Sequence, residues 1–502
     1  MILKSDLPDA TFIISSGPNA LSTSGLPSVF LGYKALSADG VAKEGIWAEW
    51  TWNGKEFQLT NDRYGFYPLF YFRTKNSFGT STSLYHLLKH VTPPKLNDGA
   101  IAVFLRLGFF LKNDTPFESI HAVPPGCTIT WHDDTLNIQT DDYPFVPAPN
   151  ALSKKAALRA YGELFQAGIA RMLPSASDKV GLPLSGGRDS RHILFALLRS
   201  GYKPAECLTM MYFPPRPNDD ARVAGKIAQA LGLKHTLLKP PKYLLSYEIR
   251  KNIITHFTTD EHTWLLPLAD YVEQENFTLL YDGIGGGVLS DGRFLSEHRL
   301  KLYDSGNFNA LAQSLLGEEK RLSHILSKQL HQRWNRELAV NHVACELAKY
   351  ANTNNPIGQF FFWNRTRREI ALSPWSILGR CVHVLAPFLN HDVYDLLTTL
   401  PLSYFLDHSF HTDTINYHYP KYSSLPYASH KLYNNRLRWN EYALLLRDLR
   451  SFFLTQESEH SYVRRSYLIL RLLQSLIDIK CRSRLPRSLA YPIYLKQLEN
   501  LI

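Results

Sequence analysis

Residues 180–200 hold an apolar run, a turn with two consecutive glycines and a helical pattern, in that order. The apolar run 180–185 predicts a buried strand, and residues 189–200 predict a helix that starts directly after the turn. The turn itself reads SGGRDS, residues 185–190. A strand that enters a helix through a glycine-rich turn is the repeating unit of an α/β sheet.

The same alternation continues on both sides of this turn. Strands are predicted at 206–213 and 277–282, and helices at 156–173 and 219–231. Strands that alternate with helices predict a doubly wound parallel sheet, and the chain beyond about residue 300 is predicted to be largely helical.

The first 145 residues have a different pattern. Short aromatic runs such as GIWAEWTW, EFQLTN and PLFYF are separated by Gly, Asn and Asp, which indicates strands joined by turns. A proline-rich stretch, YPFVPAPN at 143–150, is typical of a linker. We therefore predict a β-rich domain over 1–145 and an α/β domain over 152–502.

The SGGRDS turn has the chemistry of a phosphate site. Its glycines allow close approach to an anion and unusual backbone dihedrals, and the Ser185 and Ser190 hydroxyls and the free helix N–H groups can donate to phosphate oxygens. Asp189 fits beside phosphate only if Mg²⁺ lies between them. The turn matches neither a Walker loop nor a dinucleotide GxGxxG, and the alternative is an ordinary glycine-rich turn.

Several ordered motifs resemble the asparagine synthetase family. SGGRDS resembles its SGGxDS pyrophosphatase loop, DGIGG at 282–286 the start of DGxGGDE, and PFLN at 387–390 its PFLD segment. DDARVAGKIAQALGLKHTLL, residues 219–238, looks like the family's second helix and following strand. NDRYGFYPLFYF and DTPFESIHAVPPGCTITW resemble the glutaminase half, which implies an Ntn-hydrolase-like sandwich at the N-terminus.

The resemblance implies an ATP-dependent ligase that adenylates a carboxylate for attack by ammonia or an amine, with ATP and Mg²⁺ as cofactors. Thr209 and Met210 end a predicted strand, so they are candidates for the adenine wall, and core packing is the alternative. Asp189 would be the metal ligand. The residues expected to bind ATP and pyrophosphate are Leu184, Ser185, Gly186, Gly187, Asp189, Ser190, Thr209, Met210, Asp282 and Gly283.

Relatives also use a late lysine to stabilise charge at the α-phosphate. Lys431 follows Leu425-Pro426, as the family's lysine follows a similar pair, and is the first choice. Lys421 is the second choice, and a surface lysine is the alternative for both.

The chain departs from the family at three places. It begins Met1-Ile2-Leu3, whereas the family's glutaminase has a cysteine after the initiator methionine, so we expect that half to lack its nucleophile. Cys127, the first cysteine, is expected to be packing. Gly287-Val288 replaces the family's Asp-Glu, and the candidates to replace the lost metal ligand are Asp282, Asp291 and Glu297. Asn390 replaces the Asp of PFLD, with Arg380 the nearest arginine before it.

These departures leave two functions open. An emptied N-terminal half resembles β-lactam synthetases and lasso-peptide cyclases, which form amides without glutamine. The alternative is a non-catalytic, nucleotide-binding partner protein, and catalytic turnover of ATP to AMP would separate the two.

The net charge and the cysteines indicate possible partners and the cellular location. The formal net charge is +10, with much of the excess between residues 464 and 487, where an anionic partner or a solvated helix face would explain it. Five scattered cysteines, with no signal peptide or membrane span evident, predict a cytoplasmic protein. Asp260-Glu261-His262 is expected where a helix begins near the mouth of the sheet, either favouring the helix dipole or contacting an amine or the polar groups of the carboxylate substrate.

Overall fold

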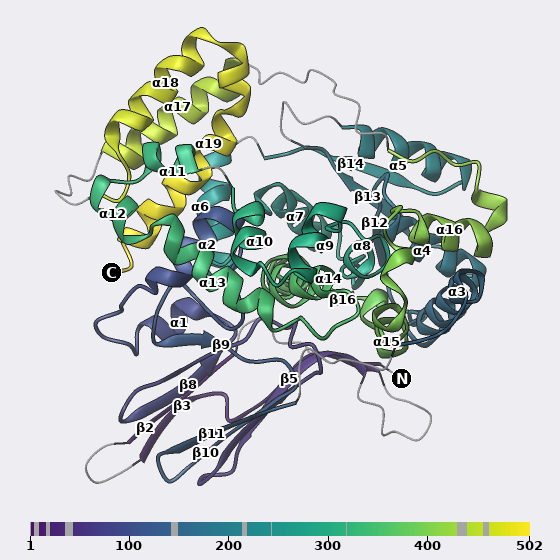
Figure 1. The fold of residues 1–502 in the computed structure, drawn as a ribbon, viewed down its shortest axis with the longest axis horizontal. Coiled ribbons are helices and arrows are strands. Elements are labelled where there is room, and N and C mark those ends of the chain that lie inside the picture. The colour runs from purple at the N-terminus through teal and green to yellow at the C-terminus, as the bar shows by residue number, and fades with distance from the viewer. Residues whose placement is uncertain are drawn as a thin grey trace.

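The computed structural model describes residues 2–4, 10–16, 21–35, 44–141, 149–212, 218–241, 243–317, 319–428, 439–454 and 461–502. Figure 1 shows a β-rich N-terminal part at the bottom, an α/β region above it, and a group of C-terminal helices at the upper left. No helix in these ranges is long and apolar enough to cross a membrane.

The N-terminal part is a sandwich of two antiparallel sheets. One has the order β1 (Ile2–Lys4), β4 (Ser28–Ala35), β5 (Glu44–Trp52), β6 (Phe57–Asn61), β10 (Cys127–His132), β11 (Thr135–Thr140). The other has the order β3 (Leu21–Gly25), β2 (Thr11–Ser16), β8 (Ser77–Ser81), β7 (Phe70–Arg73), β9 (Ile120–Ala122). Helices α1 (Leu84–Leu88) and α2 (Asp98–Leu107) follow β8.

Alternation along the strands explains the sandwich. Every second residue of β4 is buried, so Val29 and Leu31 face the other sheet, where Phe12 and Ile14 of β2 meet them in one apolar cluster. Period-two burial of this kind is what a strand with one core face requires.

The middle of the chain forms a parallel sheet with the order β14 (His235–Leu238), β13 (Glu206–Met210), β12 (Val180–Pro183), β15 (Leu279–Tyr281), β16 (His383–Leu385). All four neighbouring pairs are parallel. The connecting helices include α3 (Lys154–Arg171), α4 (Asp189–Arg199), α5 (Asp219–Ala230), α6 (Leu244–Ile254) and α7 (Leu266–Gln274). The predicted fold class, a β-rich sandwich followed by a doubly wound sheet, is confirmed.

The remainder is helical, as predicted. After the short α8 (Gly286–Ser290) come α9 (Glu297–Asp304), α10 (Phe308–Leu315), α11 (Glu319–Ile325), α12 (Lys328–Arg333), α13 (Arg336–Ala348), α14 (Pro356–Phe361), the π-helical η2 (Phe362–Ile370), α15 (His391–Thr399) and α16 (Phe410–His418). The chain ends with α17 (Trp439–Leu454), α18 (Arg465–Ile477) and α19 (Ile479–Glu499). In α18 and α19, Arg465, Arg484 and Arg487 are exposed, and an anionic partner for them stays a prediction.

The two halves are joined by buried polar contacts. Arg367 of η2 is 4% exposed and donates to the backbone oxygens of Lys112 and Val123 in the β-rich part, at 3.0 and 2.8 Å. Tyr33 of β4 accepts a hydrogen bond from the Ala386 N–H, at 3.1 Å. Buried acceptors of this kind are costly to leave unpaired, so the contacts fix η2 against the sandwich. The boundaries 1–145 and 152–502 stay a prediction.

Candidate active site

Three segments that are far apart in the sequence meet at the carboxyl ends of neighbouring strands. The SGGRDS turn follows β12, Met210 ends β13, and Asp282 follows β15. Because β13 and β15 flank β12, their ends surround a common crevice, the usual ligand site of such sheets. A cavity of about 400 Å³ lies there. Its walls include eight of the predicted residues: Leu184, Ser185, Asp189, Ser190, Thr209, Met210, Asp282 and Gly283.

The two glycines of the turn do not line this cavity. Neither has a positive φ, so neither lies in the left-handed region that favours glycine. Gly186 is required by close packing instead, since a Cβ there would lie 2.7 Å from the Cβ of Ala428. The Gly186 N–H donates to Asp220 at 3.2 Å, and its carbonyl accepts from the Ala428 N–H at 3.1 Å. Gly186 therefore holds the turn between α5 and the segment at 428.

The serine hydroxyls organise the turn internally. Ser190 Oγ accepts from the Ser185 N–H at 3.0 Å, and the two hydroxyl oxygens are 3.1 Å apart. Ser185 Oγ also accepts from the Gly187 N–H at 3.1 Å. These bonds fix the turn so that the start of α4 faces the cavity. Helix N-termini favour anions.

Asp189 projects from the first turn of α4 into a space that exists only because its neighbours are glycines. A Cβ on Gly283 would lie 2.7 Å from the Asp189 Cβ, and a Cβ on Gly286 would lie 2.5 Å from Asp189 Oδ1. Desolvation and then the charge of Asp291 raise the pKa of Asp189 to about 7. Desolvation and the nearby negative charge disfavour the ionised form of Asp189. A cation would stabilise that ionised form, so the site suits a metal ion.

The buried side chain of His411 lies next to Asp189. His411 Nδ1 lies 3.4 Å from Asp189 Oδ1, and His411 Nε2 lies 3.1 Å from Nδ1 of His192. Burial lowers the pKa of His411 to about 3, so its imidazole is neutral. His411 therefore does not cancel the charge of Asp189.

The three proposed replacements for the lost metal ligand have different positions. Asp282 lines the cavity with Asp189, and burial raises its pKa to about 6. Asp291 forms an ion pair with Arg188 at 3.0 Å, and its buried Oδ1 has no hydrogen bond within the described part of the chain. Glu297 begins α9, is exposed and does not line the cavity. Of these three, only Asp282 lines the cavity with Asp189, while Asp291 lies close enough to Asp189 to raise its pKa.

The lysine prediction finds no support among the described residues. Lys431 lies outside them, and Lys421 is exposed, with its Nζ 4.7 Å from the ring centroid of Tyr422. No described lysine lines the cavity, and its cations are Arg293 and Arg365. Our sequence analysis missed both arginines. Arg293 follows the DGIGG motif closely enough to have been considered.

Other predicted residues have mostly structural contacts. The Thr209 hydroxyl donates to the Leu184 carbonyl at 2.6 Å, so only part of this residue faces the cavity. Arg380 is exposed and lies outside the cavity. Asn390 caps α15 and donates to Glu44 at 2.9 Å, which joins the two halves.

Comparisons with known proteins agree with this geometry. A family model described as asparagine synthase matches residues 160–414, just over half of the chain. The chain belongs to the asparagine synthase family. A second model, described as a glutamine amidotransferase domain, matches residues 29–143. No curated protein matches the chain.

Two solved structures share weak similarity with this family member. One is a glutamine phosphoribosylpyrophosphate amidotransferase from B. subtilis, complexed with ADP and GMP. It has 10% identity and a TM-score of 0.14, with 50% of this chain and 44% of that chain covered. The other is an allosteric regulatory enzyme of purine biosynthesis. It has 8% identity and a TM-score of 0.15, with 42% of this chain and 44% of that chain covered. The chain thus spans less than half the length of either structure.

The glycines beside Asp189 make a matched pair of tests. Gly286→Ala places a methyl group 2.5 Å from Asp189 Oδ1, so the carboxylate must turn away. Gly287→Ala places one 3.6 Å from Asp189 Oδ2, an ordinary contact. We expect Gly286→Ala to weaken Mg²⁺-dependent ATP binding at least about tenfold, and Gly287→Ala to leave it nearly unchanged, by equilibrium dialysis. Equal effects would contradict the assigned position of Asp189.

Proposed function

We propose that this protein adenylates a carboxylate with ATP, releases pyrophosphate, and forms an amide when ammonia or a substrate amine displaces AMP. The observation that carries the proposal is the SGGRDS turn, placed by β12 and α4 at a cavity shared with Asp282. Backbone N–H groups at the start of α4 supply donors to phosphate, and Thr209 and Met210 supply a wall for the base.

Mg²⁺ fits this site, because Asp189 and Asp282 offer carboxylate oxygens on adjacent turns and glycine neighbours leave space around Asp189. When bound, the ion would neutralise the charge of the pyrophosphate leaving group. Asp189 and Asp282 would hold this ion, while Arg293 supplies further positive charge at the cavity wall.

The nitrogen source is proposed to be ammonia or an amine rather than glutamine. Cys127 is 2% exposed on β10, and burial raises the pKa of its thiol to about 12. A buried thiol with a raised pKa is a poor nucleophile. All five cysteines are free thiols, which supports a reducing, cytoplasmic location as part of the proposal.

The central test is ATP–pyrophosphate exchange against a panel of carboxylates, including peptides with free Asp or Glu side chains. The products should be AMP and pyrophosphate. Asp189→Ala should abolish exchange, because the carboxylate that links metal to pyrophosphate is lost. ADP and phosphate as products would exclude this chemistry, and binding without any exchange would favour the non-catalytic alternative that Gly287 suggests.

The residue at position 287 affects the Mg²⁺ concentration that the protein needs for exchange. An Asp there would begin with its Cβ 3.6 Å from Asp189 Oδ2, close enough to share a cation. Since an additional carboxylate beside Asp189 strengthens Mg²⁺ binding, Gly287→Asp should reach half-maximal exchange at a lower Mg²⁺ concentration than the natural chain. Gly287→Asn is the size-matched control. If the natural chain saturates at low Mg²⁺ and Asp282→Ala removes this, Asp282 already supplies the second carboxylate.

Glutamine should not serve as nitrogen donor. We expect no glutamate release from glutamine by the natural chain, and no change in amide formation from ammonium in Cys127→Ala, since this thiol is buried in the sandwich. Glutamate release, measured by an enzyme-coupled assay, would show that the N-terminal half retains a nucleophile.

A further inference from the structure

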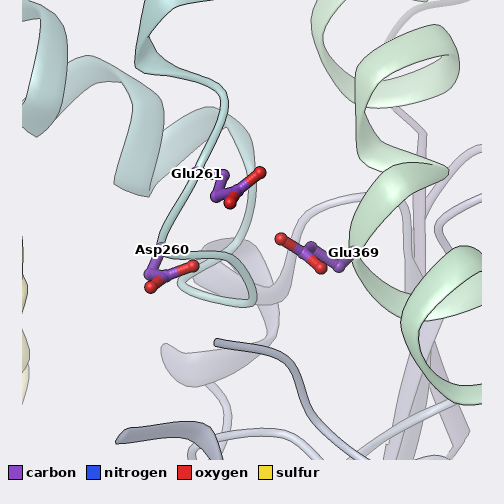
Figure 2. A group of neighbouring side chains, drawn as sticks. All are labelled: Asp260, Glu261 and Glu369. Atoms are coloured by element: carbon purple, nitrogen blue, oxygen red, sulfur yellow. The ribbon is translucent and has the colours of Figure 1, made fainter. Parts of the chain in front are cut away.

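A second group of carboxylates lies at the edge of the ATP cavity. Asp260 and Glu261 precede the short helix η1 (Thr263–Leu265), and Glu369 projects toward them from η2 (Figure 2). One oxygen from each lies within 4.8 Å of the others. Glu261 lines the cavity, as do its neighbour His262 and Arg365. This acidic group therefore adjoins the cavity without belonging to the phosphate site.

The acidic group has more acceptors than donors. The Glu369 side chain is 3% exposed, and its Oε2 has no hydrogen bond from any described residue, although Arg365 Nε lies 3.1 Å away as an ion pair. Tyr491 donates to Asp260 at 2.9 Å. Lys251 is held by Glu248, at 2.7 Å, and donates to the Thr259 carbonyl. Arg365, Lys251 and Arg321 offset part of the charge of the three carboxylates, but burial and mutual repulsion still raise the pKa of Asp260 and of Glu369.

His262 adds another unpaired acceptor. Its Nε2 lies 3.1 Å from the Glu369 carbonyl oxygen, an acceptor, so the ring proton is on Nε2. Its Nδ1 then carries a lone pair, and this buried atom accepts no hydrogen bond from any residue that the structure describes. Burial lowers the pKa of His262 to about 4, so the ring stays neutral. Buried acceptors without donors indicate a ligand that supplies donors.

We propose that Asp260, Glu261 and Glu369 bind the protonated primary amine of the nitrogen donor at the edge of the ATP cavity, an inference that rests on the proposed function. A primary ammonium carries three donors and one positive charge, which matches three carboxylates and a partial counter-charge from Arg365. An amine bound there lies beside the site where the carboxylate is activated.

The test uses the full chain and methylammonium chloride as probe, measured by saturation-transfer NMR without ATP. Glu261→Gln and Glu369→Gln should each weaken methylammonium binding at least about tenfold, or 1.4 kcal/mol. Glu261 is exposed, so its variant is expected to fold even if the buried Glu369→Gln does not. Asp407→Asn, an exposed acid paired with Lys154, is the matched control and should bind normally.

Two further probes separate the alternatives. Tetramethylammonium has the same charge but no donors, and its binding as tightly as methylammonium would overturn the proposal. Mn²⁺ binding that persists in Asp189→Ala but is lost in Glu261→Gln would overturn it in favour of a metal site. Unchanged methylammonium binding in both Gln variants would also overturn it.

The reaction supplies an independent measure. In Glu369→Gln, whose side chain does not line the ATP cavity, ATP–pyrophosphate exchange should stay near wild type, while the KM for amine in amide formation should rise at least about tenfold. Absence of exchange in the natural chain would contradict the proposed function. Normal exchange with an unchanged KM for amine would contradict only the amine site.

Discussion

The site depends on the packing of the Asp189 carboxylate against a turn made of glycines. β12 and β15 are neighbours, so the turns that follow them approach within contact distance at Asp189, Gly283 and Gly286. Any side chain on either glycine would displace the carboxylate. The two motifs are therefore one physical unit, since each needs the residue types of the other.

The β-rich half contributes to the site indirectly. Arg367 fixes η2 to the sandwich through buried carbonyls, and η2 also carries Arg365 and Glu369. The wall that faces the ATP cavity is thus positioned by contacts made more than 200 residues earlier in the chain.

In the proposed chemistry, the metal ion and the protonated amine bind at two different places. Phosphate and metal belong to the ends of β12 and β15, where Asp189 and Asp282 lie. The amine belongs to the acidic group, and Glu261 of this group lines the same cavity. Because like charges repel, separating the cationic donor from the cationic metal keeps both sites occupied at once.

Sequence alone determined the strand, turn and helix around SGGRDS, because apolar periodicity and glycine punctuation are local signals. It also determined the alternation that makes a parallel sheet, and hence the crevice at Leu184, Thr209 and Asp282. It misjudged why Gly186 is a glycine, since the reason is Ala428, a contact 242 residues away. Only the tertiary structure brought Glu369 to Asp260 and Glu261, because no local pattern encodes the distance between side chains that meet through folding.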